Sequence, residues 1–450
     1  MPRKFRRLAT SKDLTRLMTR YYATRKVVGK VRPLAWVTSG APVEILIGMG
    51  VATAYPENYG ALLGARKAAV PLARVAEEQG FSPDLCSYAR SHIGSVLDPR
   101  NAPQGGMPKP DLLVACNNIC GTVIKWYQAL ARDLDIPLFL LDAPYQHEPG
   151  LSDHTVQYVA AQLEELIAWV TQHTGRKLND KRFAQALELS NEAVTLWREI
   201  RELCQARPSP LNAPDLFLTM APIVVLRGTK DAVTFYQKLK AEVEERVARG
   251  EGAVLEERYR LLWDNIAIWY RLFRLFGLFI DAGACFVVDT YTNAWSVSVE
   301  TSEPILGLAR TYSTVYINQS LQARAGQMID LAQRFAVDGM VFHSNRSCKP
   351  YSLGQYELLE QVSQHTGVPG LILEADMCDT RLYADEPVKN RIQAFLDLLE
   401  ASPLPTDTGS TSRETPASSA LPAGAGSDLR ETPASSAFPA GAGSNSRKTT

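Results

Sequence analysis

Short apolar runs alternate with amphipathic stretches near the start of the chain. The apolar runs predict three strands, at residues 43–50, 112–115 and 137–141. The stretches with apolar residues three and four positions apart predict helices, at residues 59–79, from 84 onwards and at 122–134. Strands and helices in this alternation are typical of parallel strands joined by helical crossovers. We therefore expect a first α/β lobe over residues 41–150.

The pattern changes in the middle of the chain and then returns. Long amphipathic stretches predict a helical segment over residues 151–255, with helices at 156–173, 181–204 and 231–249. Alternation resumes in a second expected α/β lobe over residues 256–400, with strands at 284–288, 340–342 and 371–374 and helices at 257–281, 321–336, 352–365 and 388–399. The predicted fold class is α/β, with two parallel-sheet lobes around a helical middle segment.

Both ends of the chain differ from this pattern. Residues 1–40 predict a basic helical arm, whose cations are opposed mainly by Asp13. A contact with a partner subunit or a solvated helix is the favoured interpretation, with RNA or a membrane surface as the alternative. Residues 413–427 recur almost unchanged as 430–444 and consist largely of Pro, Ala, Gly and Ser. Such a repeat buries too little apolar surface to fold, so residues 401–450 predict a disordered tail without a catalytic role.

Composition limits the function classes. The 48 basic and 48 acidic residues balance, so no overall field draws the chain to nucleic acid. The apolar run at 275–288 is interrupted by Asp281, which argues against membrane insertion. The seven cysteines are odd in number and sparse, which indicates a reducing, cytoplasmic setting without a disulfide scaffold.

Three of these cysteines share a local setting. Cys348 follows a predicted strand and directly precedes a helix start, where free N–H groups together with Arg346 and Lys349 favour a thiolate. Cys86 and Cys120 also lie in turns or at helix starts. In open α/β sheets, ligands gather beyond the carboxyl ends of the strands, so two facing lobes would bring the three sulfurs together in an iron–sulfur site. The alternative is that they are small buried residues, since the dense C-x2-C-x2-C run of ferredoxins is absent.

The amino-acid sequences of four segments resemble those of a known protein family. These are Pro56-Glu57-Asn-Tyr-Gly60, Cys86-Ser-Tyr-Ala-Arg90, Cys120-Gly with Lys125-Trp-Tyr127, and His343-Ser-Asn-Arg-Ser-Cys-Lys-Pro-Tyr-Ser-Leu-Gly-Gln355. In this order they resemble the 2-hydroxyacyl-CoA dehydratase and benzoyl-CoA reductase subunit family, of the 2-hydroxyglutaryl-CoA dehydratase D-component type, over residues 33–399. The resemblance implies two flavodoxin-like lobes and a 4Fe–4S cluster between them, held by Cys86, Cys120 and Cys348.

The resemblance also implies an activity. The β-hydrogen of a 2-hydroxyacyl-CoA is not acidic, but adding one electron to the thioester gives a ketyl radical that expels the 2-hydroxyl and acidifies that hydrogen. The implied partners are a homologous second subunit, forming a heterodimer, and a separate ATP-dependent iron–sulfur activator; the chain itself has no G-x-x-x-x-G-K-[ST] phosphate loop. The alternatives are ATP-dependent reduction of an aromatic acyl-CoA such as benzoyl-CoA, a non-catalytic electron-relay or assembly subunit, and a structural zinc protein.

Further residues take implied roles. Ser39 would bind the leaving hydroxyl or the thioester, and Glu57 would act as an acid or base, unless it is only a carboxylate at a helix N-terminus. His343 and Arg346 would tune the cluster, unless His343 is only a buried, hydrogen-bonded histidine. Cys116 is an alternative ligand, whereas the other cysteines are expected in the core: Cys204, Cys285 and Cys378.

Overall fold

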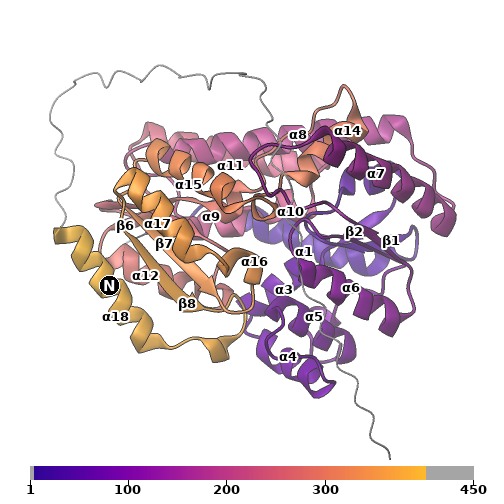
Figure 1. Cartoon of the computed structure of the whole chain (residues 1–450), viewed down its shortest axis with the longest axis horizontal. Helices are drawn as coiled ribbons and strands as arrows, with labels where there is room; N and C mark the ends of the chain where they lie inside the picture. Colours follow the sequence, from indigo (N-terminus) through magenta and orange to yellow (C-terminus); the bar gives the residue numbers. More distant parts are fainter. Residues whose placement is uncertain (1–4, 402–450) are drawn as a thin grey trace, which may run out of the picture. The chain divides into compact units, whose positions relative to one another are not determined.

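The computed structural model describes residues 5–401, which contain two four-stranded sheets. The first has the order β2-β1-β3-β4, made of Leu34–Val37 (β1), Ala52–Ala54 (β2), Leu112–Cys116 (β3) and Leu138–Leu141 (β4). The second has the order β6-β5-β7-β8, made of Tyr259–Asp264 (β5), Ala284–Asp289 (β6), Gly339–Asn345 (β7) and Gly370–Ala375 (β8). Every strand pair is parallel, and the two lobes repeat one strand order, which confirms the predicted α/β class. Figure 1 labels β1 and β2 of the first sheet and β6, β7 and β8 of the second.

The amino-terminal arm contains more than a helix. Helix α1 spans Ser11–Val28, but residues 34–37 form β1, which pairs with both β2 and β3 near the centre of the first sheet. The predicted boundary at residue 40 is therefore wrong, because the apolar residues of β1 lie in the core. The arm packs on its own chain: Tyr21 is buried and Arg20 pairs with Asp231 at 2.7 Å.

Two apolar runs take the opposite form from the predicted one. Residues 43–48 form helix α2 (Val43–Gly48) instead of a strand, and the predicted helix at 257–281 begins with strand β5. Residues 43–48 and 259–264 are buried almost throughout, so neither segment shows the period that separates a helix from a strand. Strand β2, of three residues, was not predicted.

The remaining helices of the first lobe follow the sequence pattern more closely. The predicted helix at 59–79 is divided in two at Lys67, whose φ of 57° lies in the left-handed region. The helices are α3 (Pro56–Ala65), α4 (Ala69–Glu78), α5 (Ser87–Leu97) and α6 (Gly121–Leu134), with a 3-10 turn at Pro103–Gly105.

The helical middle segment is confirmed. Its long helices are α7 (Asp153–Thr174), α8 (Asp180–Glu202) and α11 (Lys230–Ala248). The side chains of Ser152 and Asn179 accept backbone N–H groups and cap α7 and α8. Short elements connect them: η2 (Leu203–Gln205), α9 (Ala213–Thr219) and α10 (Ala221–Val225).

The second lobe adds helices around β5–β8. They are η3 (Trp269–Arg271), α12 (Leu272–Asp281), α13 (Thr290–Asn293), α14 (Pro304–Ser313), η4 (Tyr316–Asn318), α15 (Leu321–Arg334), α16 (Lys349–Ser352), α17 (Gln355–Thr366), η5 (Thr380–Leu382) and α18 (Asp385–Ala401). The predicted helix at 352–365 begins later, because Gly354 adopts a φ of 78° between α16 and α17.

One apolar core joins the lobes to the middle segment. It contains Val37 of β1, Trp197 of α8 and Trp263 of β5, all of them buried. No helix within residues 5–401 has both the length and the apolar character needed to cross a bilayer. The predicted disordered tail lies outside the described residues from position 402 onwards.

Candidate active site

A pocket of about 500 Å³ lies where elements of both lobes and the helical middle meet. Cys86 and Cys120 of the first lobe and Cys348 of the second all line it, as do Ser39 and Glu57. Leu14 and Met18 of helix α1 also line this pocket, together with residues of α8, α9 and α14. The structure therefore brings five predicted site residues, more than 300 positions apart in sequence at the extremes, to one cavity.

Each of the three cysteines stands at the start of a helix. Cys86 precedes α5, Cys120 precedes α6 and Cys348 precedes α16. These three are partly exposed, whereas the other four cysteines are buried. The three thiols that a ligand in the pocket can reach are thus the three that the sequence analysis selected.

Burial controls the ionisation of these thiols. It raises the pKa of Cys86 to about 12 and the pKa of Cys120 to about 11, although N–H groups of the first turn oppose the rise. Burial and the neighbouring Cys86 and Cys120 also raise the pKa of Cys348 well above its usual range. The expectation that its surroundings favour a Cys348 thiolate is therefore wrong for the chain without a metal. Arg346 and Lys349 do not stabilise a Cys348 thiolate, because both side chains are exposed. Lys349 Nζ instead donates to the Arg346 carbonyl at 2.8 Å.

Three cysteine thiols are the ligand type that an iron–sulfur cluster takes. Within residues 5–401, no three or more His, Cys, Asp or Glu side chains are arranged to hold one metal ion. In a 4Fe–4S cluster each thiolate binds a different iron, so its ligands need not converge on one point. A cationic cluster would also supply the charge that the buried thiols need to ionise.

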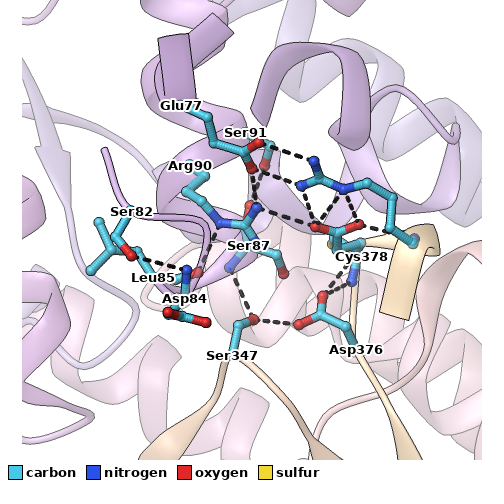
Figure 2. A network of polar contacts seen from close by, with 12 residues as sticks. Glu77, Ser82, Asp84, Leu85, Ser87, Arg90, Ser91, Ser347, Asp376 and Cys378 are labelled. Atoms are coloured by element: carbon cyan, nitrogen blue, oxygen red, sulfur yellow. Dashed lines mark hydrogen bonds and ion pairs between the residues drawn. The ribbon is translucent and has the colours of Figure 1, made fainter. Parts of the chain in front are cut away.

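The loops that carry Cys86 and Cys348 are joined by one hydroxyl group. Ser347 Oγ accepts the N–H of Ser87 at 3.0 Å and donates to Asp376 (Figure 2). Asp376 Oδ1 in turn accepts the N–H groups of Cys378 and Asp379, at 2.8 and 2.7 Å. Ser347, Ser87 and Asp376 are all buried. This chain of bonds connects the residue after one pocket cysteine to the residue before another.

A buried arginine makes a second link between the lobes. Arg90 of α5 is fully buried, and its guanidinium pairs with Asp379, from the loop after β8, at 3.1 Å (Figure 2). It also pairs with Glu77 of α4 and donates from Nε to the Leu85 carbonyl at 2.9 Å. Breaking a buried pair by removing one partner leaves an unpaired charge, so this link is costly to lose.

Ser39 and Glu57 contact each other at the pocket. The N–H of Ser39 donates to Glu57 Oε2 at 2.6 Å. Burial raises the pKa of the Glu57 carboxyl to about 7, even though the N–H and hydroxyl of Ser39 lower it. Glu57 does lie in the first turn of α3, as the alternative interpretation expected. A carboxyl that titrates near neutral pH is nevertheless suited to proton transfer.

Three further candidates do not line the pocket. His343 is buried, its Nδ1 bonds the Ile266 carbonyl at 2.6 Å, and burial lowers its pKa to about 4, as in the alternative interpretation of a buried histidine. The side chain of Arg346 is exposed. Cys116 is buried in β3, where its N–H donates to Thr38. Cys204, Cys285 and Cys378 are buried, as expected.

The sequence analysis missed a buried polar network in the pocket wall. Glu44 of α2 accepts hydrogen bonds from Ser190, Arg227 and Tyr312, at 2.7, 3.0 and 2.8 Å. All four residues line the pocket. They come from separate parts of the chain, and Glu44 fell within a predicted strand, so no local motif indicated their contact.

Comparisons with known proteins agree with the motif resemblance. The family described as 2-hydroxyglutaryl-CoA dehydratase, D-component, matches residues 38–399. The chain is 33% identical to the (R)-2-hydroxyisocaproyl-CoA dehydratase alpha subunit of Clostridioides difficile, covering 85% of this chain and 94% of that one. It is 32% identical to the lactoyl-CoA dehydratase subunit alpha of Anaerotignum propionicum, over 82% and 91%. It is 28% identical to one subunit of the benzoyl-CoA reductase of Thauera aromatica, over 79% and 86%.

Proposed function

Because this chain belongs to the 2-hydroxyglutaryl-CoA dehydratase D-component family, we propose that it is the iron–sulfur subunit of an enzyme that removes water from a 2-hydroxyacyl-CoA. The observation that carries this proposal is the shared pocket. Three partly exposed cysteines from both lobes line one cavity with a carboxyl group that titrates near neutral pH.

Cys86, Cys120 and Cys348 would hold a 4Fe–4S cluster. When held by these three thiolates, such a group would supply one-electron transfer to a bound thioester. The bonds of Ser347 and Arg90 would hold the cysteine-bearing loops of the two lobes in register.

The pocket's own residues would handle the proton chemistry. Near neutral pH the Glu57 carboxyl is present in both protonation states, so it can donate a proton to the leaving 2-hydroxyl group or accept one from the β-carbon. The N–H of Ser39 keeps the carboxyl in place, and its hydroxyl, which also interacts with this carboxyl, would bind the substrate hydroxyl or thioester. The largely apolar wall excludes water, which strengthens each of these interactions.

The proposal includes partners. Relatives are named as alpha subunits, so we assign this chain to a heterodimer with a homologous second subunit. A separate ATP-dependent iron–sulfur activator would deliver the electron, in a reducing cytoplasm. We expect the enzyme to work anaerobically, since such a cluster would be sensitive to oxygen.

An anaerobic assay tests the proposal. The chain, purified with its second subunit and activator, is expected to convert a 2-hydroxyacyl-CoA to the enoyl-CoA in the presence of ATP and a reductant. It is expected to contain about four irons per chain in a 4Fe–4S cluster. Colourless protein with stoichiometric zinc would contradict the cluster. Reduction of benzoyl-CoA instead of dehydration would favour the aromatic reductase alternative, and activity with neither would favour an electron-relay role.

A further inference from the structure

The pocket wall contains a buried cation that is already neutralised. The Arg227 guanidinium is 6% exposed, donates from Nε to Glu44 at 3.0 Å, and also donates to the Ala41 carbonyl at 3.3 Å and to the Tyr312 hydroxyl. Its central carbon lies over two rings, 5.3 Å from the centre of Trp295 and 5.5 Å from that of Tyr312. Stacking and pairing of this kind hold a guanidinium in place.

The Glu44 carboxylate is equally well held. It is fully buried, and both of its oxygens accept hydrogen bonds, from Ser190, Arg227 and Tyr312. Although burial opposes ionisation, Arg227 and the two hydroxyl groups lower the pKa of Glu44 below its ordinary value. The pair is therefore ionised at neutral pH and carries no net charge toward the cavity.

The other charged residues that line the pocket provide no buried cation to replace Arg227. Its lining includes two carboxylic acids, Glu44 and Glu57, and two cations, Arg66 and Arg227. Arg66 is exposed, so its charge stays hydrated. Much of the remaining wall is aromatic or aliphatic, as at Phe217, Trp269 and Val297. A second carboxylate on the substrate would lose its water here without finding a free buried cation to pair with.

We infer that this pocket takes an acyl group with an uncharged aliphatic or aromatic side chain, and that Glu44 excludes dicarboxylic acyl groups by neutralising Arg227. The inference rests on the proposed function and specifies its substrate class. A site that discriminates in this way leaves the charge of the wrong substrate desolvated and unpaired, while it makes apolar contact with the right one.

A two-substrate assay on the complete enzyme tests the inference. The specificity constants kcat/KM for 2-hydroxyisocaproyl-CoA and 2-hydroxyglutaryl-CoA are measured with the second subunit and the activator present. We expect the apolar substrate to be favoured by at least about 100-fold, since burying an unpaired carboxylate costs more than several methylene contacts. A ratio within tenfold, or a preference for the dicarboxylic substrate, would overturn the inference while leaving the dehydratase proposal intact. Dehydration of neither substrate would overturn the proposed function instead.

Substitution of Glu44 tests whether this residue causes the discrimination between the two substrates. Glu44→Gln keeps the side-chain shape but leaves Arg227 free to pair with a substrate carboxylate, so the preference for the apolar substrate is expected to fall at least tenfold. The matched control is Glu257→Gln, which also breaks a buried pair, with Arg260 at 2.6 Å, but lies outside the pocket lining. Equal substrate ratios in the two variants would refute the role of Glu44.

A double variant separates charge from folding effects. Glu44→Gln with Arg227→Met removes both charges, so the apolar preference is expected to return toward that of the unmodified enzyme. If Glu44→Gln does not fold, binding of the two thioesters to the unmodified complex without activator, measured by calorimetry, decides the substrate class alone. Tighter binding of 2-hydroxyglutaryl-CoA in that measurement would refute it.

Discussion

Replacing Ser347 with alanine tests whether one hydroxyl group holds two pocket loops together. The variant removes the acceptor of the Ser87 N–H and the donor to Asp376, while Asp376 keeps its two backbone N–H partners. Ser87 is 1% exposed, so water cannot easily replace the lost acceptor. Leaving a buried donor unsatisfied costs about 1–3 kcal/mol, and the lost bond to a carboxylate adds a comparable amount. We expect the free energy of unfolding to fall by about 2–6 kcal/mol.

The same bonds restrain the residues next to Cys86 and Cys348. If opening of these loops becomes easier by about 2 kcal/mol, the open state becomes about 30-fold more populated, because 1.4 kcal/mol corresponds to a factor of ten. Anaerobic iron release to a chelator is expected to accelerate by a similar factor. The assay is therefore chelator-dependent bleaching of the anaerobic protein, combined with denaturant unfolding.

Ser313→Ala provides the matched control. Ser313 is also fully buried, but its hydroxyl donates only within its own helix, to the Ala309 carbonyl at 2.7 Å. Losing that bond is expected to cost about 0.5–1.5 kcal/mol and to leave iron release unchanged. If Ser347→Ala releases iron no faster than Ser313→Ala, the hydroxyl does not position the cysteine loops and our reasoning fails.

Four further predictions concern the pocket and the tail. Cys348→Ser is expected to lose most of the bound iron while far-ultraviolet circular dichroism stays unchanged, whereas Cys116→Ser, in a buried strand, keeps it; equal iron contents would remove Cys348 from the ligand set. Glu57→Gln is expected to lower kcat by about 10²–10⁴-fold, and a smaller loss would leave Glu57 without a proton-transfer role. Because the folded pKa of Glu57 is raised to about 7, the folded protein binds more protons than the unfolded chain between about pH 4.5 and 7, so its contribution to stability is lost as pH rises through that window; unfolding at several pH values should show this slope flattened in Glu57→Gln. Deleting residues 402–450 is expected to leave kcat/KM within twofold, since the repeat has too few large apolar residues to form a core, and a large loss of activity would show that the tail contributes.

The local sequence pattern was sufficient to predict an element where only one face of it is buried, and to find a site residue where a short motif marks a turn. Helices α7, α8 and α11 were predicted because each keeps a polar face, so the period of 3.6 is visible. The three pocket cysteines were found because each stands at a helix start within a recognisable motif. Ser39 and Glu57 were found through the family resemblance, while their 2.6 Å contact became visible only in the structure.

The tertiary structure decided the remaining features. Burial on all sides removes the hydrophobic period that separates a helix from a strand, and contacts between residues far apart in the chain leave no local pattern in the sequence. Helix α2 and strand β5 are buried so completely that their apolar runs look alike, and only the neighbouring strands and helices determine which form each takes. Burial also reversed the expected ionisation of Cys348, since desolvation outweighs the nearby N–H groups. Glu44 and Arg227 are 183 positions apart, so the charge balance of the pocket, and with it our substrate assignment, depends on folding alone.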